Sequence, residues 1–225
     1  MTTYQGELER GIIAKNLEDF EQAIKYFSAA IALEDNHPEP YFYRANIYNH
    51  SLQNYPAALA DYDQAIALKG DDEGYYYNRA LLYLNMGDLE GALEDYEAAL
   101  KIKPDYALAL WDVALIHSEL EEFEQALEEL DKVLHLAPYS AAIIHKDKGN
   151  IYYKLEEFDL ALEQYNQSLT LDPYSIYAYK GRGTLYTTLG RYEEALADLQ
   201  KALEYAPDDT DAKQRMAHLE KRMNG

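Results

Sequence analysis

The side chains that could bind a metal ion or perform catalysis do not form a recognisable arrangement in this sequence. Its 225 residues include six histidines, and no two of them are three or four residues apart, as two ligands on one helix face would be. Cysteine is absent, which excludes thiolate ligands, disulfides and cysteine nucleophiles. There is also no glycine-rich phosphate-binding loop. We therefore predict no catalytic residue, no metal site and no cofactor, and we expect that the protein is not an enzyme.

The carboxylates are numerous, and most of them are expected to face solvent. There are 41 acidic and 20 basic residues, so the net charge is −21. The acidic run at residues 119–131 has no apolar pocket predicted around it, and we interpret it as a solvated face rather than as acid–base pairs. Residues 208–211 lack the glycine and the distal glutamate of a calcium-binding loop.

Charge and hydrophobicity also exclude some partners and locations. Nucleic acids and anionic membrane surfaces require a basic footprint, so we predict that neither is a partner. No window approaches eighteen consecutive apolar residues, and the N-terminal residues have no apolar run, so we expect neither membrane insertion nor a signal peptide. With no cysteines to oxidise, a cytoplasmic location is expected.

An internal repeat organises the chain and would position any functional side chain. An alanine within one short pattern recurs at intervals of 34 or 35 residues, as Ala23, Ala58, Ala92, Ala126, Ala161 and Ala195. A second small residue precedes each of these alanines by about twelve positions. Within each repeat the apolar residues recur at spacings of three and four, which predicts two helices. In the third repeat, residues 85–88 provide a helix stop followed by an Asp N-cap.

This pattern resembles the tetratricopeptide repeat family over residues 5–223. The sixth repeat carries the motif as Tyr179, Gly183, Tyr186, Gly190, Tyr192, Ala195, Ala202 and Pro207. The resemblance implies an all-α, right-handed superhelical solenoid whose first helices line a concave groove. We predict one domain, residues 1–225, with six helix-turn-helix repeats at residues 5–38, 39–71, 72–105, 106–139, 140–174 and 175–208. A capping helix is expected at 209–223, where Ala212, Met216, Leu219 and Met223 form an apolar stripe.

Two repeats depart from the regular length. One extra residue lies within 49–54, and another lies between Pro138 and Gly149. We expect a longer turn at each place.

The family's inward-facing positions identify candidate groove residues. Those of the first four repeats are mainly apolar and aromatic, and the candidates among them are Phe42, Tyr43, Asn46, Tyr77, Asn78 and Trp111. Those of the last two repeats and the tail include Lys146, Asn150, Lys180 and Arg215. Family members that grip a C-terminal carboxylate use a clamp of lysines, asparagines and an arginine. Lys146, Asn150 and Arg215 match three positions of that clamp, whereas Gly181 and Asp211 replace two others, so the resemblance to this subgroup is partial.

From these residues we predict a non-enzymatic protein–protein interaction module, such as a scaffold, adaptor or assembly factor. It would bind a partner peptide in the groove through aromatic anchors. The basic residues of the last two repeats and the tail would contact an acidic segment of the partner or its C-terminal carboxylate. We favour a monomer. A second interpretation stays open, namely a structural subunit that self-associates or packs into a larger complex through its ends or convex face.

Overall fold

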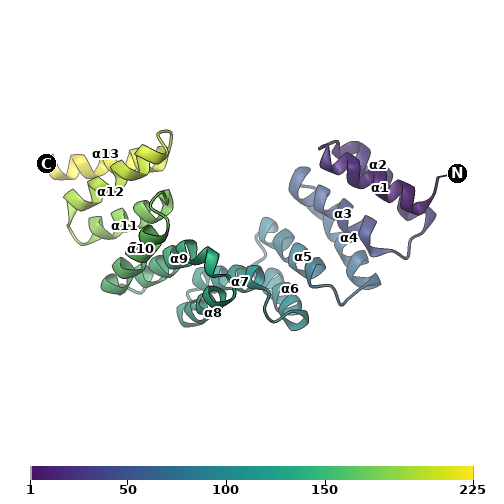
Figure 1. Cartoon of the computed structure of the whole chain (residues 1–225), viewed down its shortest axis with the longest axis horizontal. Helices are drawn as coiled ribbons and strands as arrows, with labels where there is room; N and C mark the ends of the chain where they lie inside the picture. The colour runs from purple at the N-terminus through teal and green to yellow at the C-terminus, as the bar shows by residue number, and fades with distance from the viewer. Residues whose placement is uncertain (1, 225) are drawn as a thin grey trace. The chain divides into compact units, whose positions relative to one another are not determined.

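The computed structural model describes residues 2–224, and this part of the chain is almost entirely helical (Figure 1). It contains thirteen α-helices, one π-helical turn, one 3-10 turn and no strand within the described residues. The prediction of an all-α fold built from paired helices is therefore confirmed. None of the described helices is both long and apolar enough to cross a bilayer. The internal contacts divide the chain into two compact halves, residues 1–112 and residues 113–225.

The N-terminal half holds three complete helix pairs. Its elements are α1 (Tyr4–Asn16), α2 (Phe20–Leu33), α3 (Pro38–Asn46), η1 (Ile47–Ser51), α4 (Tyr55–Leu68), α5 (Glu73–Met86), α6 (Leu89–Ile102) and the first part of α7 (Ala107–Glu119). Helix α1 packs on α2, α3 on α4, and α5 on α6, so each sequence repeat forms one antiparallel pair.

The C-terminal half continues the same construction. Its elements after α7 are α8 (Phe123–Leu136), η2 (Pro138–Ser140), α9 (Ala141–Lys154), α10 (Phe158–Leu171), α11 (Ile176–Thr188), α12 (Tyr192–Tyr205) and α13 (Thr210–Asn224). Helix α13 packs on α12, and Leu219 of α13 is 1% exposed against Ala195 and Leu199. The predicted capping helix is thus present.

Local turn chemistry explains where the helices end. Gly87 adopts a left-handed conformation with φ of 78°, and the Asp88 carboxylate accepts the Gly91 N–H at 3.0 Å. The predicted helix stop and N-cap are both confirmed at this turn. Asp209 caps α13 in the same way, because its carboxylate accepts the Ala212 N–H at 2.8 Å.

Both extra residues are accommodated within helices and not in the turns between them. In the third repeat the Asp88 N–H reaches the Tyr83 carbonyl, whereas in the second repeat the Asn54 N–H reaches back six residues to the Tyr48 carbonyl at 2.8 Å. The first extra residue lies in the π-helical turn η1, so the expectation of a longer turn there was wrong, because the helix itself widens. The expectation was also wrong for the second extra residue, because residues 137–140 between α8 and α9 number four, like residues 103–106 between α6 and α7. The extra residue lies within α9, which begins eight residues before Gly149, whereas α11 begins seven residues before Gly183.

The core of each repeat pairs small residues with one large side chain from the second helix. All six repeat alanines are completely buried. The ring of Phe27 lies over Gly11, and the ring of Tyr165 lies between Gly149 and Gly181. A small residue at these places lets the helices approach closely.

Candidate functional site

The aromatic candidates lie on the first helices of the N-terminal half, and each is partly exposed. Phe42 and Tyr43 belong to α3, Tyr77 belongs to α5, and Trp111 belongs to α7. The centroid of the Phe42 ring is 5.8 Å from that of Tyr43 and 4.9 Å from that of Tyr75. These positions provide aromatic surface of the kind that anchors protein ligands.

A second aromatic group surrounds Tyr77. The Tyr77 ring centroid is 5.6 Å from that of Tyr96 and 5.0 Å from that of Tyr106. Asp112 of α7 lies beside the hydroxyl groups of Tyr77 and Tyr96. Burial raises the pKa of the Asp112 carboxyl, and these two hydroxyl groups oppose the shift.

The three candidate asparagines are engaged inside the protein. The Tyr62 hydroxyl donates to the Asn46 side chain at 2.6 Å, and the Tyr165 hydroxyl donates to Asn150 at 2.7 Å. Asn78 donates through its side-chain amide to the Gly74 carbonyl at 2.7 Å. Their side-chain amides therefore satisfy neighbouring groups of the protein, and any ligand would compete with those bonds.

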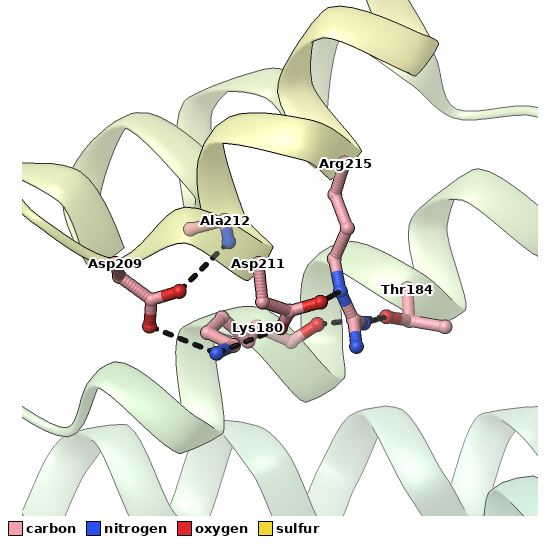
Figure 2. Close-up of polar contacts among 6 residues, drawn as sticks. All are labelled: Lys180, Thr184, Asp209, Asp211, Ala212 and Arg215. Carbon is pink, nitrogen blue, oxygen red and sulfur yellow. Dashed lines mark hydrogen bonds and ion pairs between the residues drawn. The ribbon is translucent and has the colours of Figure 1, made fainter.

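The basic candidates of the C-terminal half are paired with carboxylates of the same half (Figure 2). The Lys180 ammonium lies 2.8 Å from Asp209 and 2.7 Å from Asp211. The Arg215 guanidinium lies 2.8 Å from Asp211 and donates to the Thr184 hydroxyl at 2.6 Å. This network, which we call the cap network, joins α11 to α13 and balances two cations with two carboxylates.

The pKa values of the cap network agree with stable pairing. Burial tends to lower the pKa of Lys180, but its hydrogen bonds to Asp209 and Asp211 outweigh this effect and raise it. Arg215 and then Lys180 lower the pKa of Asp211. Lys180 and Asp211 are therefore both charged near neutral pH. Lys146, the remaining basic candidate, forms an ion pair with its neighbour Asp147.

A pocket of about 340 Å³ lies between α11 and α13, next to the cap network. Buried Leu199 and Leu219 contribute apolar lining, whereas Thr184 and Arg215 contribute polar lining. The complete lining is Gly183, Thr184, Thr187, Thr188, Leu199, Asp211, Gln214, Arg215, His218 and Leu219. Of the sequence-predicted site residues, only Arg215 lines this pocket.

Sequence reasoning missed a repeated arginine–aspartate pair that joins the two helices of a repeat. Three arginines each bind one aspartate through two hydrogen bonds of 2.7–2.8 Å: Arg44 with Asp61, Arg79 with Asp95, and Arg182 with Asp198. Arg79 of the third repeat also lies 2.6 Å from Asp63 of the second repeat. The signal was available, because each arginine directly precedes the small residue of its first helix.

Part of the acidic run 119–131 is likewise not simply solvated. Glu129 lies 2.9 Å from the His117 ring, and Asp131 lies 2.6 Å from Lys148. Both contacts connect α8 to a neighbouring helix. Asp131 is exposed, as the interpretation of a solvated face expects, whereas Glu129 is only partly exposed, so the interpretation was wrong for Glu129.

Comparison with known families identifies the repeat. A tetratricopeptide repeat model matches residues 45–111 and 149–220, and two further models with the same description match residues 83–146 and 8–74. The chain belongs to the tetratricopeptide repeat family. Such proteins are generally non-enzymatic interaction scaffolds, and the fold supports a protein–protein interaction module with protein partners. Among residues 2–224, no group of three or more His, Asp or Glu side chains is placed to hold a metal ion.

Solved structures with the same fold include three informative examples. YrrB, described as a TPR protein with an unusual peptide-binding site, has 25% identity and a TM-score of 0.66, covering 87% of this chain and 97% of that one. PilF of Pseudomonas aeruginosa has 14% identity and a TM-score of 0.75, covering 96% and 97%. The Cut9–Hcn1 hetero-tetramer of the APC/C has 17% identity and a TM-score of 0.74. The similarity to Cut9–Hcn1 covers 96% of this chain but only 43% of the matched Cut9–Hcn1 chain.

At their low identities, PilF and Cut9–Hcn1 show the fold alone. A search of curated proteins found no match.

Proposed function

We propose that this tetratricopeptide repeat protein binds a segment of a partner protein along its first helices, as a scaffold, adaptor or assembly factor. The observation that carries the proposal is the set of partly exposed aromatic side chains on α3, α5 and α7. The core of these repeats is filled by other rings, such as Tyr62 and Tyr96, which are completely buried. Phe42, Tyr43 and Tyr77 therefore retain surface for a ligand. The peptide-binding site described for YrrB supports the same mode of action.

The second part of the proposal concerns Lys146, Asn150, Lys180 and Arg215. An acidic side chain or a C-terminal carboxylate would bind here by exchanging with the carboxylates that now pair with these cations. Such exchange between ion pairs contributes little net free energy, because one ion pair replaces another. We therefore assign most of the affinity to the aromatic anchors and expect the basic residues to influence orientation. As part of the same proposal the protein acts as a cytoplasmic monomer.

Titration of a partner segment captured from the native source tests the proposal. Trp111→Ala should reduce affinity by about 2 kcal/mol or more, the range of an aromatic hot spot. Lys146→Glu and Arg215→Glu should weaken binding less, and added salt should shrink their effects. Circular dichroism of each variant would confirm that the helices are retained.

The matched control is Glu128→Lys, which changes an exposed side chain on the second helix α8. If this change abolishes binding while the three first-helix variants bind normally, the partner does not use the first helices.

One observation favours the alternative of a structural subunit. Ile13 of α1 is 59% exposed, Leu17 directly after α1 is 76% exposed, and Leu33 of α2 is 47% exposed. Such apolar surface at the first repeat would be buried by a second copy or by a neighbouring subunit. Light scattering would reveal a dimer, and Leu17→Glu should then convert it to a monomer. A monomeric wild-type protein would remove self-association through this surface.

A further inference from the structure

Asp112 differs from every buried carboxylate in the described part of the chain. The buried acids all form ion pairs with a lysine or arginine: Glu7 with Arg10, Asp61 with Arg44, Asp95 with Arg79, Asp147 with Lys146, and Asp198 with Arg182. Asp112 is partly buried, yet no lysine or arginine among residues 2–224 lies within ion-pair distance of it. Its Oδ2 atom is shielded from solvent and has no hydrogen-bond partner. A carboxylate in this state lacks the compensation that buried charges normally have.

The neighbouring repeats explain why the Tyr96 hydroxyl lies beside Asp112 and not beside an asparagine. In the second and fifth repeats, the core tyrosine donates its hydroxyl to an asparagine that directly follows the small residue, namely Asn46 or Asn150. In the third repeat Leu81 occupies that position, so the Tyr96 hydroxyl has no such acceptor. It lies beside Asp112 instead. Burial, and next the charge of Asp112, raise the pKa of this hydroxyl, so it stays protonated.

The surroundings of Asp112 are suited to a positive charge. The Tyr77 hydroxyl lies beside the carboxylate, and the Tyr77 and Tyr106 ring centroids are 5.0 Å apart. Both tyrosines are partly exposed. The faces of aromatic rings attract cations. Lys103 already lies 5.0 Å from the Tyr106 ring centroid, but its ammonium group is paired with Glu73 at 3.1 Å. The Tyr106 ring therefore already contacts one cation, but the charge of that cation is balanced by Glu73 and not by Asp112.

We propose that Tyr77, Tyr106 and Asp112 form a recognition site for a lysine or arginine side chain of the partner protein. This inference rests on the proposed function and adds a chemical requirement to it, namely a basic residue in the bound segment. The carboxylate would gain the counter-ion that it lacks, and the two rings would contact the cation. The net charge of −21 would attract a basic segment over longer distances. The cations of the cap network are already paired with Asp209 and Asp211, so they are less suited than Asp112 to bind a charged group of a partner.

The test uses N-acetyl-argininamide and N-acetyl-lysinamide as probes of the full-length protein, with N-acetyl-norleucinamide as a neutral probe of similar length. Nuclear magnetic resonance would follow the side-chain carboxyl carbon of Asp112 during each titration. The cationic probes should shift this signal and lower the pKa of Asp112, and the neutral probe should do neither. Asp112→Asn should weaken binding of the cationic probes about tenfold, a typical effect of losing one charged partner in a partly desolvated site.

The matched control is Glu97→Gln, which removes one negative charge at an exposed position of α6 in the same half. It should change the affinity less than twofold. Tyr106→Phe should bind like the wild type because it keeps the ring, whereas Tyr106→Leu should bind several-fold more weakly. Equal losses for Asp112→Asn and Glu97→Gln would overturn the proposal, because only general charge attraction would then be present. An Asp112 signal that ignores the cationic probes would also overturn it. Neither result would affect the partner titration with Trp111→Ala, so the two proposals can fail separately.

Discussion

Two glycines on the same helix provide a sharp test of the packing between repeats. Gly181 and Gly183 lie two residues apart in α11, and both have ordinary helical backbone conformations. A Cβ atom on Gly181 would lie 2.6 Å from Cε1 of Tyr165, far inside normal contact distance. A Cβ atom on Gly183 would meet its nearest neighbours, the Ala195 carbonyl oxygen and the Asp198 Cβ, at 3.5 Å, an ordinary contact. Alanine should therefore destabilise the protein at position 181 and stabilise it at position 183.

The expected magnitudes follow from two opposing effects. Alanine stabilises a helix interior by about 1 kcal/mol relative to glycine. At position 181 this gain is offset by overpacking, which costs about 1–3 kcal/mol. The Tyr165 ring has little room to move, because it is 1% exposed, lies against Gly149 on its other side and donates to Asn150 at 2.7 Å. We expect Gly181→Ala to lose about 1 kcal/mol of stability and Gly183→Ala to gain up to about 1 kcal/mol.

Urea denaturation with hydrogen exchange would measure this difference. Repeat proteins do not always unfold in one step, so exchange of the α10 and α11 amides is needed to locate the effect. The amides of α10 and α11 should exchange faster in Gly181→Ala and more slowly in Gly183→Ala than in the wild type. Equal stability of the two variants would refute the close contact between Tyr165 and α11.

Three further predictions concern the cap, the arginine–aspartate pairs and pH. Leu219→Ala should destabilise the packing of α13 by about 2–5 kcal/mol. Met223→Ala should have little effect, because Met223 is 39% exposed. Similar melting temperatures for the two variants would contradict the capping role of α13. Arg79→Ala should lower the free energy of unfolding, measured by urea denaturation, by about 3–5 kcal/mol, because it leaves Asp95 buried without its cation. The double variant Arg79→Leu/Asp95→Leu should recover part of this loss. Because burial raises the pKa of Asp112 in the folded state, its ionised form disfavours folding above that pKa. Asp112→Asn should therefore melt at a higher temperature than the wild type at neutral pH, and the gap should narrow as pH falls through the raised pKa; a constant gap would argue against the shift.

The family, the repeated helix pairs and the turn between the helices of the third repeat could be predicted from the sequence alone. These features depend on interactions between residues close in the chain, such as the three- and four-residue spacing of apolar side chains, the left-handed Gly87 and the Asp88 cap. The apolar stripe of α13 was also visible, because its members lie on one face of a single helix. The candidate groove residues came from the family's inward-facing positions, and their role in binding remains a prediction.

The tertiary structure decided which charges and hydroxyl groups are already engaged. Lys180 is separated from Asp209 by 29 residues, and only the packing of α13 beside α11 brings the two side chains within 2.8 Å. The widened turn at Ile47–Ser51 also depends on packing, since an inserted residue can lengthen either a loop or a helix. The lack of a lysine or arginine beside Asp112 has the same origin, because it is a property of the three-dimensional surroundings of that carboxylate. Periodicity indicates which helix face a side chain occupies, but contacts between distant helices determine whether that side chain is available to a ligand.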